Sequence, residues 1–103
     1  IYYNISEFGI NICMNKYKRW YNNITESVKD RVTDEYTEVH HILPKSLGGN
    51  DSYSNLINLT AREHFICHWL LVRLYPNDTK LSHAFWNMCN GRKSNTKNQK
   101  QIN

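Results

Sequence analysis

The amino-acid sequence predicts one small α+β domain whose elements follow the order helix, strand, strand, helix, helix. Its apolar residues recur with a helical period near the start, form short β-rich runs in the middle and return to a helical pattern afterwards. Of the 103 residues, 40% are hydrophobic and 13% aromatic, which suffices for one packed core and argues against intrinsic disorder. No apolar run approaches the about 20 residues of a membrane-spanning helix. We therefore expect a single domain that does not enter a membrane.

The first expected helix covers residues 16–32 and presents one apolar face. Four side chains at spacings of three and four form this face: Tyr17, Trp20, Ile24 and Val28. We interpret the segment as an amphipathic helix that covers the core while its charges face water. Because the composition changes at Met14, we expect residues 1–13 to be an N-terminal extension and residues 14–90 to form the domain. No basic residue precedes Lys16, which argues against a secretory signal.

A β-hairpin is expected next. Residues 36–43 are rich in β-forming side chains and end at Pro44, which indicates a strand. In the following loop, Gly48 and Gly49 allow backbone angles that other residues avoid. Residues 55–59 are expected to form a second, short strand. We expect this hairpin to fold back against the helix that follows it.

Two further helices complete the expected fold. The sequence Thr60-Ala61-Arg62-Glu63 is a capping box that starts a helix, and Pro76 ends it. This helix is apolar on most sides, so we expect it to be central and buried. A last helix over residues 79–90 turns four side chains inward: Leu81, Ala84, Phe85 and Met88. Besides the apolar central helix, we expect three tryptophans to stabilise the core: Trp20, Trp69 and Trp86.

The distribution of charges and cysteines indicates which partners and which cellular environment the protein has. The formal net charge of +4 lies entirely in residues 91–103, which carry four basic residues and no acidic one. We expect this segment to be a flexible basic tail, which either contacts nucleic acid or remains a solvated end. The three cysteines are too scattered for a disulfide framework or a paired-cysteine zinc site. A reducing, cytoplasmic environment is the simplest interpretation.

Four of the five histidines lie within residues 40–68. His64 and His68 are four residues apart in the expected central helix, which places both rings on one face at a spacing that suits a shared metal ion. His40 and His41 are neighbours on the expected strand and therefore point to opposite sides of it. One of them can join the helical pair while the other faces an open groove.

We interpret three convergent imidazoles as a metal site and the fourth as a general base, since an imidazole has a pKa of about 6.5 and accepts protons near neutral pH. With a cation beside them, these groups suit phosphodiester hydrolysis. The plainer alternative is one hydrogen-bonded core histidine and one exposed histidine. His83, on the last helix, is expected to be structural or exposed.

These residues resemble a known motif. The run Glu38-Val39-His40-His41-Ile42-Leu43-Pro44, followed by Gly48-Gly49, Asn55-Leu56 and Glu63-His64 with His68, resembles the HNH endonuclease motif. More narrowly, it is similar to the small HNH homing endonucleases of bacteriophages, and the resemblance covers about residues 14–90. It implies a ββα-metal core, also called a His-Me finger, over about residues 36–75, with an N-terminal and a C-terminal helix beside it.

The resemblance also implies roles for individual residues. His41 takes the position of the general base, and Asn55 that of the middle asparagine, which braces the hairpin and orients the base. His40, His64 and His68 take metal-ligand positions. The implied reaction is metal-dependent hydrolysis of double-stranded DNA, with the helix of the motif laid toward the minor groove. One or both strands are cut by a monomer or homodimer, in the cytoplasm of a phage-infected bacterium.

The metal and the DNA contacts follow from donor chemistry and charge. Three imidazoles favour one zinc or nickel ion, whereas the resemblance implies magnesium or manganese, which prefer oxygen ligands, in catalysis. Four basic residues are expected to contact DNA phosphates, with ordinary surface charge as the alternative for the first two: Lys45, Arg62, Arg92 and Lys93. The alternative function is a non-catalytic, zinc-dependent module that binds nucleic acid.

Overall fold

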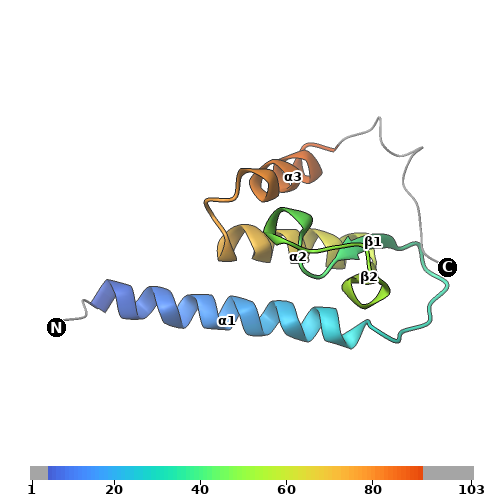
Figure 1. The fold of residues 1–103 in the computed structure, drawn as a ribbon, viewed down its shortest axis with the longest axis horizontal. Coiled ribbons are helices and arrows are strands. Elements are labelled where there is room, and N and C mark those ends of the chain that lie inside the picture. Colours follow the sequence, from blue (N-terminus) through green and yellow to red (C-terminus); the bar gives the residue numbers. More distant parts are fainter. Residues whose placement is uncertain (1–4, 92–103) are drawn as a thin grey trace.

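The computed structural model describes the backbone of residues 5–91 and the side chains of residues 16–91. Within that range the elements follow the predicted order: α1 (Ile5–Ser27), β1 (Glu38–His41), β2 (Leu56–Leu59), α2 (Ala61–Leu74) and α3 (Thr79–Cys89). They form three layers, with α2 and the hairpin between α1 and α3 (Figure 1). The predicted α+β class, with two strands followed by the central helix, is confirmed. None of the described helices is long and apolar enough to cross a membrane.

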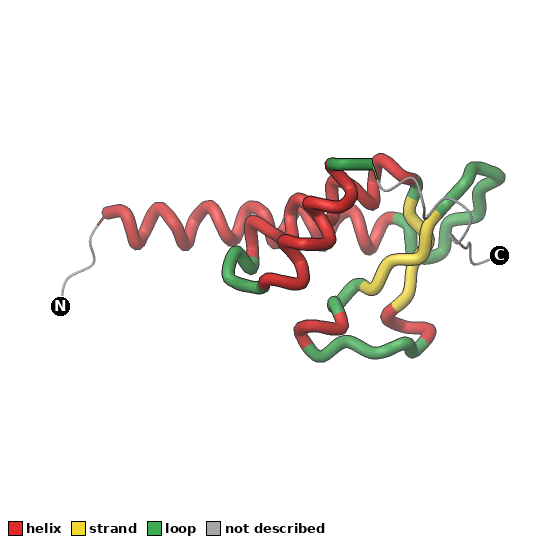
Figure 2. Tube along the Cα trace, turned by 90° about the horizontal axis from the view of Figure 1, so that it is seen from above, coloured by secondary structure: helices red, strands yellow, loops and turns green. Residues whose placement is uncertain are grey.

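The two strands form an antiparallel hairpin in which His40 pairs with Ile57 and His41 with Leu56. Both strands are shorter than predicted: the ladder runs from the pair of Glu38 with Leu59 to the pair of His41 with Leu56. Two short 3-10 turns, Lys45–Leu47 and Tyr53–Asn55, shape that loop. In Figure 2 the loop extends from one end of the hairpin, and the Ser46 hydroxyl donates to the carboxylate of Asp78, the residue that caps α3, at 3.0 Å. The loop end of the hairpin is therefore tied to the start of α3.

The central helix α2 forms as its sequence predicts. The Thr60 side chain accepts a hydrogen bond from the Glu63 backbone N–H at 3.2 Å, and the Glu63 carboxylate accepts one from the Thr60 N–H at 2.8 Å. This capping box satisfies two backbone donors that a helix start leaves unpaired. Leucines and Cys67 from α2 join residues of α1, the hairpin and α3 in the core: Tyr21, Val28, Ile57, Leu59, Cys67, Leu70, Leu71, Leu74 and Leu81.

The first helix differs from the prediction at both ends. α1 begins at Ile5 and runs unbroken through Met14, so the change of composition there is not a change of secondary structure. It ends at Ser27 rather than at residue 32, where the Ser27 hydroxyl donates to the Ile24 carbonyl at 2.8 Å. Residues 28–30 then form a turn, and Arg31 after it contacts Glu63 of α2. The division of the domain at residue 14 stays a prediction.

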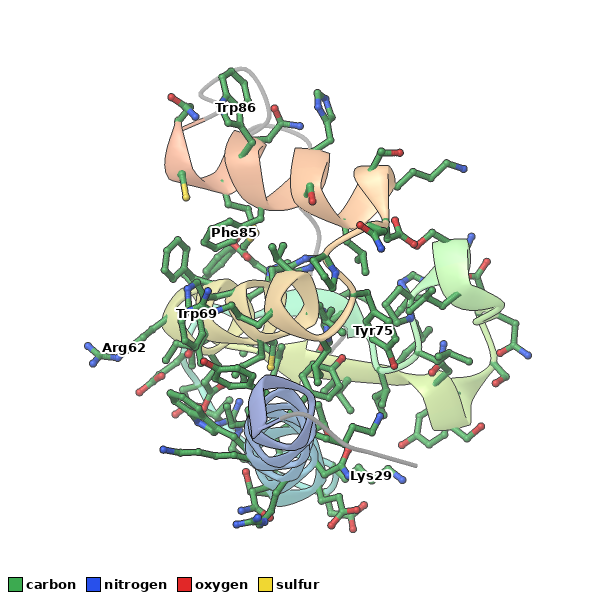
Figure 3. All side chains as sticks on the ribbon, turned by 90° about the vertical axis from the view of Figure 1, so that its left-hand side faces the viewer. Lys29, Arg62, Trp69, Tyr75, Phe85 and Trp86 are labelled. Carbon is green, nitrogen blue, oxygen red and sulfur yellow. The ribbon has the colours of Figure 1, made fainter. Side chains whose placement is uncertain are left out.

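The prediction that three tryptophans stabilise the core is wrong for Trp20 and Trp86. Trp20 is 41% and Trp86 60% exposed, and only Trp69 packs against the core. The buried face of α1 lies one residue further on, at Tyr21, which is 2% exposed and uses its hydroxyl on partners inside the protein. Phe85 is directed from α3 toward α2 and Trp86 away from it, as Figure 3 shows. The hydrophobic periodicity predicted where the helices lie, but it did not predict which of two neighbouring aromatic side chains faces inward.

Two other expectations concern His83 and the C-terminal tail. His83 lies on the exposed surface of α3, as one of the two predicted possibilities. The predicted basic tail, with Arg92 and Lys93, lies outside the described residues except for Gly91.

Candidate metal centre and catalytic site

The hairpin and α2 bring three histidines together. One ring nitrogen from each of His40, His64 and His68 lies within 4.8 Å of the others. The ring centroids are 5.2 Å apart for His40 and His64, 5.1 Å for His40 and His68, and 4.8 Å for His64 and His68. Strand alternation and the four-residue helical spacing predicted that one histidine of the strand joins the helical pair, and in the structure that histidine is His40.

The chemistry of the three rings fits a divalent cation. Burial lowers the pKa of His40 well below its ordinary value, and the neighbouring imidazoles add to the effect. Burial, with a smaller contribution from His64, lowers the pKa of His68 to about 4. Neutral imidazole is the form that binds metal. Nδ1 of His68 is also buried without a hydrogen-bond partner. Burying such a polar atom costs free energy unless a further group binds to it.

Two side chains outside the cluster hold two of its rings. Glu38 Oε1 lies 2.7 Å from Nδ1 of His64, and the Tyr21 hydroxyl lies 2.8 Å from Nε2 of His40. Neither partner was predicted. Glu38 could have been found, because it lies two residues before His40 and so on the same face of the strand. Tyr21 has no such signal, since it is 19 residues from His40 and belongs to another helix.

The other face of β1 carries His41. Its Nε2 lies 2.7 Å from Oδ1 of Asp51, and the second oxygen of Asp51 lies 3.1 Å from Nζ of Lys45. The hydrogen bond to His41, and then the one to Lys45, lowers the pKa of the Asp51 carboxyl. Asp51 was expected only as a loop residue, and no local pattern distinguished it from its polar neighbours. It is the group that holds His41 in the structure.

Asn55 braces the loop between the strands. Its Oδ1 accepts from the Leu43 N–H at 2.8 Å, and its Nδ2 donates to the carbonyls of Leu43 at 3.0 Å and Asn50 at 2.8 Å. The backbone of Gly49 packs in the same place, so close that a Cβ there would lie 1.7 Å from the Leu43 oxygen. Asn55 therefore joins the two ends of the loop that carries Asp51.

An open pocket of about 240 Å³ is lined by histidines from both faces of β1. Seven residues line it: Val39, His40, His41, Pro44, Lys45, His64 and His68. Of the predicted phosphate contacts, Lys45 thus lies at the pocket. Arg62 is exposed on the first turn of α2, does not line the pocket, and extends away from the body of the molecule in Figure 3.

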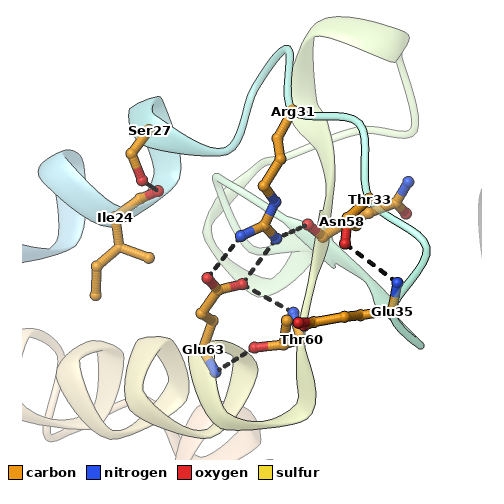
Figure 4. A network of polar contacts seen from close by, with 8 residues as sticks. All are labelled: Ile24, Ser27, Arg31, Thr33, Glu35, Asn58, Thr60 and Glu63. Atoms are coloured by element: carbon orange, nitrogen blue, oxygen red, sulfur yellow. Dashed lines mark hydrogen bonds and ion pairs between the residues drawn. The ribbon is translucent and has the colours of Figure 1, made fainter.

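A polar network fixes the start of α2 (Figure 4). The Arg31 guanidinium contacts both carboxylate oxygens of Glu63 at 2.8 Å and the Asn58 carbonyl at 3.1 Å. The Arg31 hydrogen bond is the main reason that the pKa of Glu63 falls to about 2. Since His64 follows Glu63, this network ties the first helical histidine to the chain after α1.

Comparison with known proteins points the same way. The chain is 47% identical to the probable mobile endonuclease D of Enterobacteria phage T4 in a 79-residue alignment that covers 72% of this chain and 30% of that protein. It is 44% identical to the probable mobile endonuclease E of the same phage over 75 residues, 72% of this chain and 52% of the relative. For the probable mobile endonuclease C the identity is 39% over 80 residues, 74% of this chain and 37% of the relative.

The chain thus spans between 30% and 52% of the length of these three relatives. No solved structure matches it significantly. Residues 25–68, which run from the last turn of α1 to the third histidine of the cluster, match the family model described as HNH endonuclease. Through these residues the chain belongs to the HNH endonuclease family.

Proposed function

We propose that this chain is the nuclease domain of a metal-dependent DNA endonuclease of the phage homing type. One observation carries the proposal: the buried His40, the partly buried His64 and His68 of α2, and a fourth histidine, His41 on the other face of β1, all line one pocket. Family membership supports the nuclease class, and the related phage proteins bear the name of probable mobile endonucleases. We accordingly place the activity in the cytoplasm of a phage-infected bacterium, on double-stranded DNA.

His41 is proposed as the general base. The Asp51 carboxylate accepts the Nε2–H of His41, which leaves the lone pair on Nδ1 to accept a proton from the attacking water. The water oxygen forms the new bond to phosphorus, the bond from phosphorus to the 3′ oxygen breaks, and the leaving oxygen takes a proton from solvent. Asp51 acts through His41 and is a positioning residue. Asn55 holds the loop from which Asp51 reaches the base.

His40, His64 and His68 would hold one divalent cation. When bound, such an ion supplies charge stabilisation at the phosphate oxygens and the leaving oxygen. An all-imidazole donor set favours zinc or nickel for tight binding, whereas magnesium and manganese prefer oxygen ligands. We therefore expect zinc to bind most tightly and propose magnesium or manganese as the ions to test for activity.

Lys45 is the proposed phosphate contact nearest to the reaction. Its ammonium group lies at the pocket and is held by Asp51. A DNA phosphate that enters the pocket offers Lys45 a second anionic partner. Arg62, on the exposed start of α2, is proposed to contact the DNA backbone further away, and Arg92 and Lys93 remain proposed contacts of the tail.

A supercoiled-plasmid assay tests the proposal. Wild type, His41→Ala and the control His83→Ala are compared with magnesium, manganese, zinc or a chelator, and bound metal is measured in parallel. We expect metal-dependent cutting that falls by about 10²–10⁴-fold in His41→Ala, with metal content unchanged, and that persists in His83→Ala. Open-circle product indicates nicking and linear product indicates paired cutting. Metal and DNA binding without cutting by any ion would contradict the proposal and support a binding module.

A further inference from the structure

The helix α1 reaches the histidine cluster through one side chain. Tyr21 is 2% exposed, and its hydroxyl oxygen contacts two groups of β1 and its extension: the Ile42 carbonyl at 2.7 Å and Nε2 of His40 at 2.8 Å. Tyr21 lies before the segment 25–68 that matches the family model. The contact is therefore a property of how this chain packs α1 on the hairpin.

The positions of the protons follow from counting donors. A tyrosine hydroxyl has one hydrogen, and a backbone carbonyl can only accept. The Tyr21 hydrogen is therefore used on the Ile42 carbonyl, and the contact with His40 requires that the ring nitrogen be the donor. Nε2 of His40 must carry a hydrogen, so in the neutral ring the lone pair is on Nδ1.

We propose that Tyr21 is a positioning residue that selects Nδ1 of His40 as the atom that binds the metal ion. The inference rests on the proposed metal site and adds to it a residue and a ligand atom. Hydrogen bonds from the far nitrogen of a ligating histidine are what fix its tautomer and ring orientation in metal proteins. Here the Ile42 carbonyl accepts the hydrogen bond of the Tyr21 hydroxyl, and the hydroxyl oxygen in turn accepts a hydrogen bond from the His40 ring.

His64 shows the same arrangement with the nitrogens exchanged. A carboxylate can only accept, so the Glu38 contact requires a hydrogen on Nδ1 of His64 and leaves the lone pair on Nε2. The histidine from the strand thus presents Nδ1 and the histidine from the helix presents Nε2. The two hydrogen-bond partners outside the cluster are Tyr21 of α1 and Glu38 of β1. Of these two elements, only β1 contributes a proposed metal ligand, His40.

Tyr21→Phe tests the proposal because it keeps the buried ring and removes only the hydroxyl. Cobalt binding, followed by visible absorption with zinc competition, is measured for wild type, Tyr21→Phe and Tyr17→Phe. Tyr17 is the matched control, since it lies on the same helix as Tyr21 and its ring packs on Trp69 of α2. We expect metal affinity to fall by about 10–100-fold in Tyr21→Phe and to stay unchanged in Tyr17→Phe.

A second measurement needs no variant. Long-range proton–nitrogen NMR of the metal-free wild type reads the tautomer of each histidine, and we expect the Nε2–H form for His40. An Nδ1–H form, metal bound through Nε2 of His40, or wild-type metal affinity in a folded Tyr21→Phe protein would overturn the proposal. A wild type that binds metal with this tautomer yet cuts no DNA would leave it standing and reject only the proposed nuclease function.

Discussion

The two faces of β1 place adjacent histidines in opposite environments. On the closed face, His40 is 3% exposed, and the side chains of His64 and its partner Glu38 are 17% and 19% exposed. On the open face, His41 is held by Asp51, whose side chain is 67% exposed. The closed face draws its partners from two helices and a strand, whereas the open face depends on one loop.

This difference matches what each face has to do. A ligand histidine must stay neutral and keep one orientation, which burial and fixed hydrogen bonds provide. A general base must meet water and substrate and release its proton afterwards, which requires access. One strand supplies both because its side chains alternate. Variants that disturb one face should therefore leave the function of the other intact.

The largest effect is expected on the closed face. His64→Ala removes one of the three imidazoles, so we expect metal affinity to fall by more than the about 10–100-fold typical of losing an outer partner. Calorimetric titration with zinc measures it. His83→Ala, a histidine on the exposed surface of α3, is the control and should bind as wild type does. Unchanged affinity in His64→Ala would mean that the cluster does not hold the ion.

The next effect concerns the loop of the open face. A Cβ on Gly49 would lie 1.7 Å from the Leu43 oxygen, so Gly49→Ala forces backbone to move, and we expect it to lower the free energy of unfolding by about 3 kcal/mol. Gly48 has φ of 99° but open space around it, so Gly48→Ala should cost about 1 kcal/mol. Urea unfolding compares the two. Equal effects would show that the loop is not packed as described.

A smaller effect should separate the faces most clearly. Asp51→Ala removes the partner of His41, and we expect the rate of cutting to fall about 10-fold through loss of orientation while metal affinity stays at the wild-type value. Asp51→Asn keeps an oxygen that can accept from Nε2–H, so it should recover part of the rate. Weaker metal binding in Asp51→Ala would contradict the independence of the two faces.

The sequence predicted the closed face better than the open one. Two local periods predicted that His64 and His68 share a helix face and that one of His40 and His41 joins them, and the family resemblance selected His40. Asp51 and Tyr21 could not be found in this way, because their roles depend on how a loop and a distant helix meet β1. The misplaced Trp20 has the same origin, since periodicity does not decide which of two adjacent aromatic residues finds a buried partner.

The smallest effect is expected for the ion pair at the start of α2, the helix that carries His64 and His68 of the closed face. Arg31 and Glu63 form a two-point ion pair at 2.8 Å with both side chains 28% exposed, which makes a coupling energy of about 1 kcal/mol the reasonable expectation. A double-mutant cycle with Arg31→Met and Glu63→Gln measures it by urea unfolding. Glutamine at residue 63 can still complete the capping box, so the cycle isolates the ion pair from the helix start.

The sign of the pH dependence gives an independent check on this ion pair. Arg31 lowers the pKa of Glu63 from 4.5 to about 2, so between these values the unfolded chain binds a proton at this site and the folded chain does not. The stabilisation is therefore complete above about pH 4.5 and disappears as the pH falls toward about 2. Wild type should lose more stability than Glu63→Gln between about pH 6 and about pH 3. Equal losses would mean that Glu63 titrates normally and that the start of α2 is held by its capping box alone.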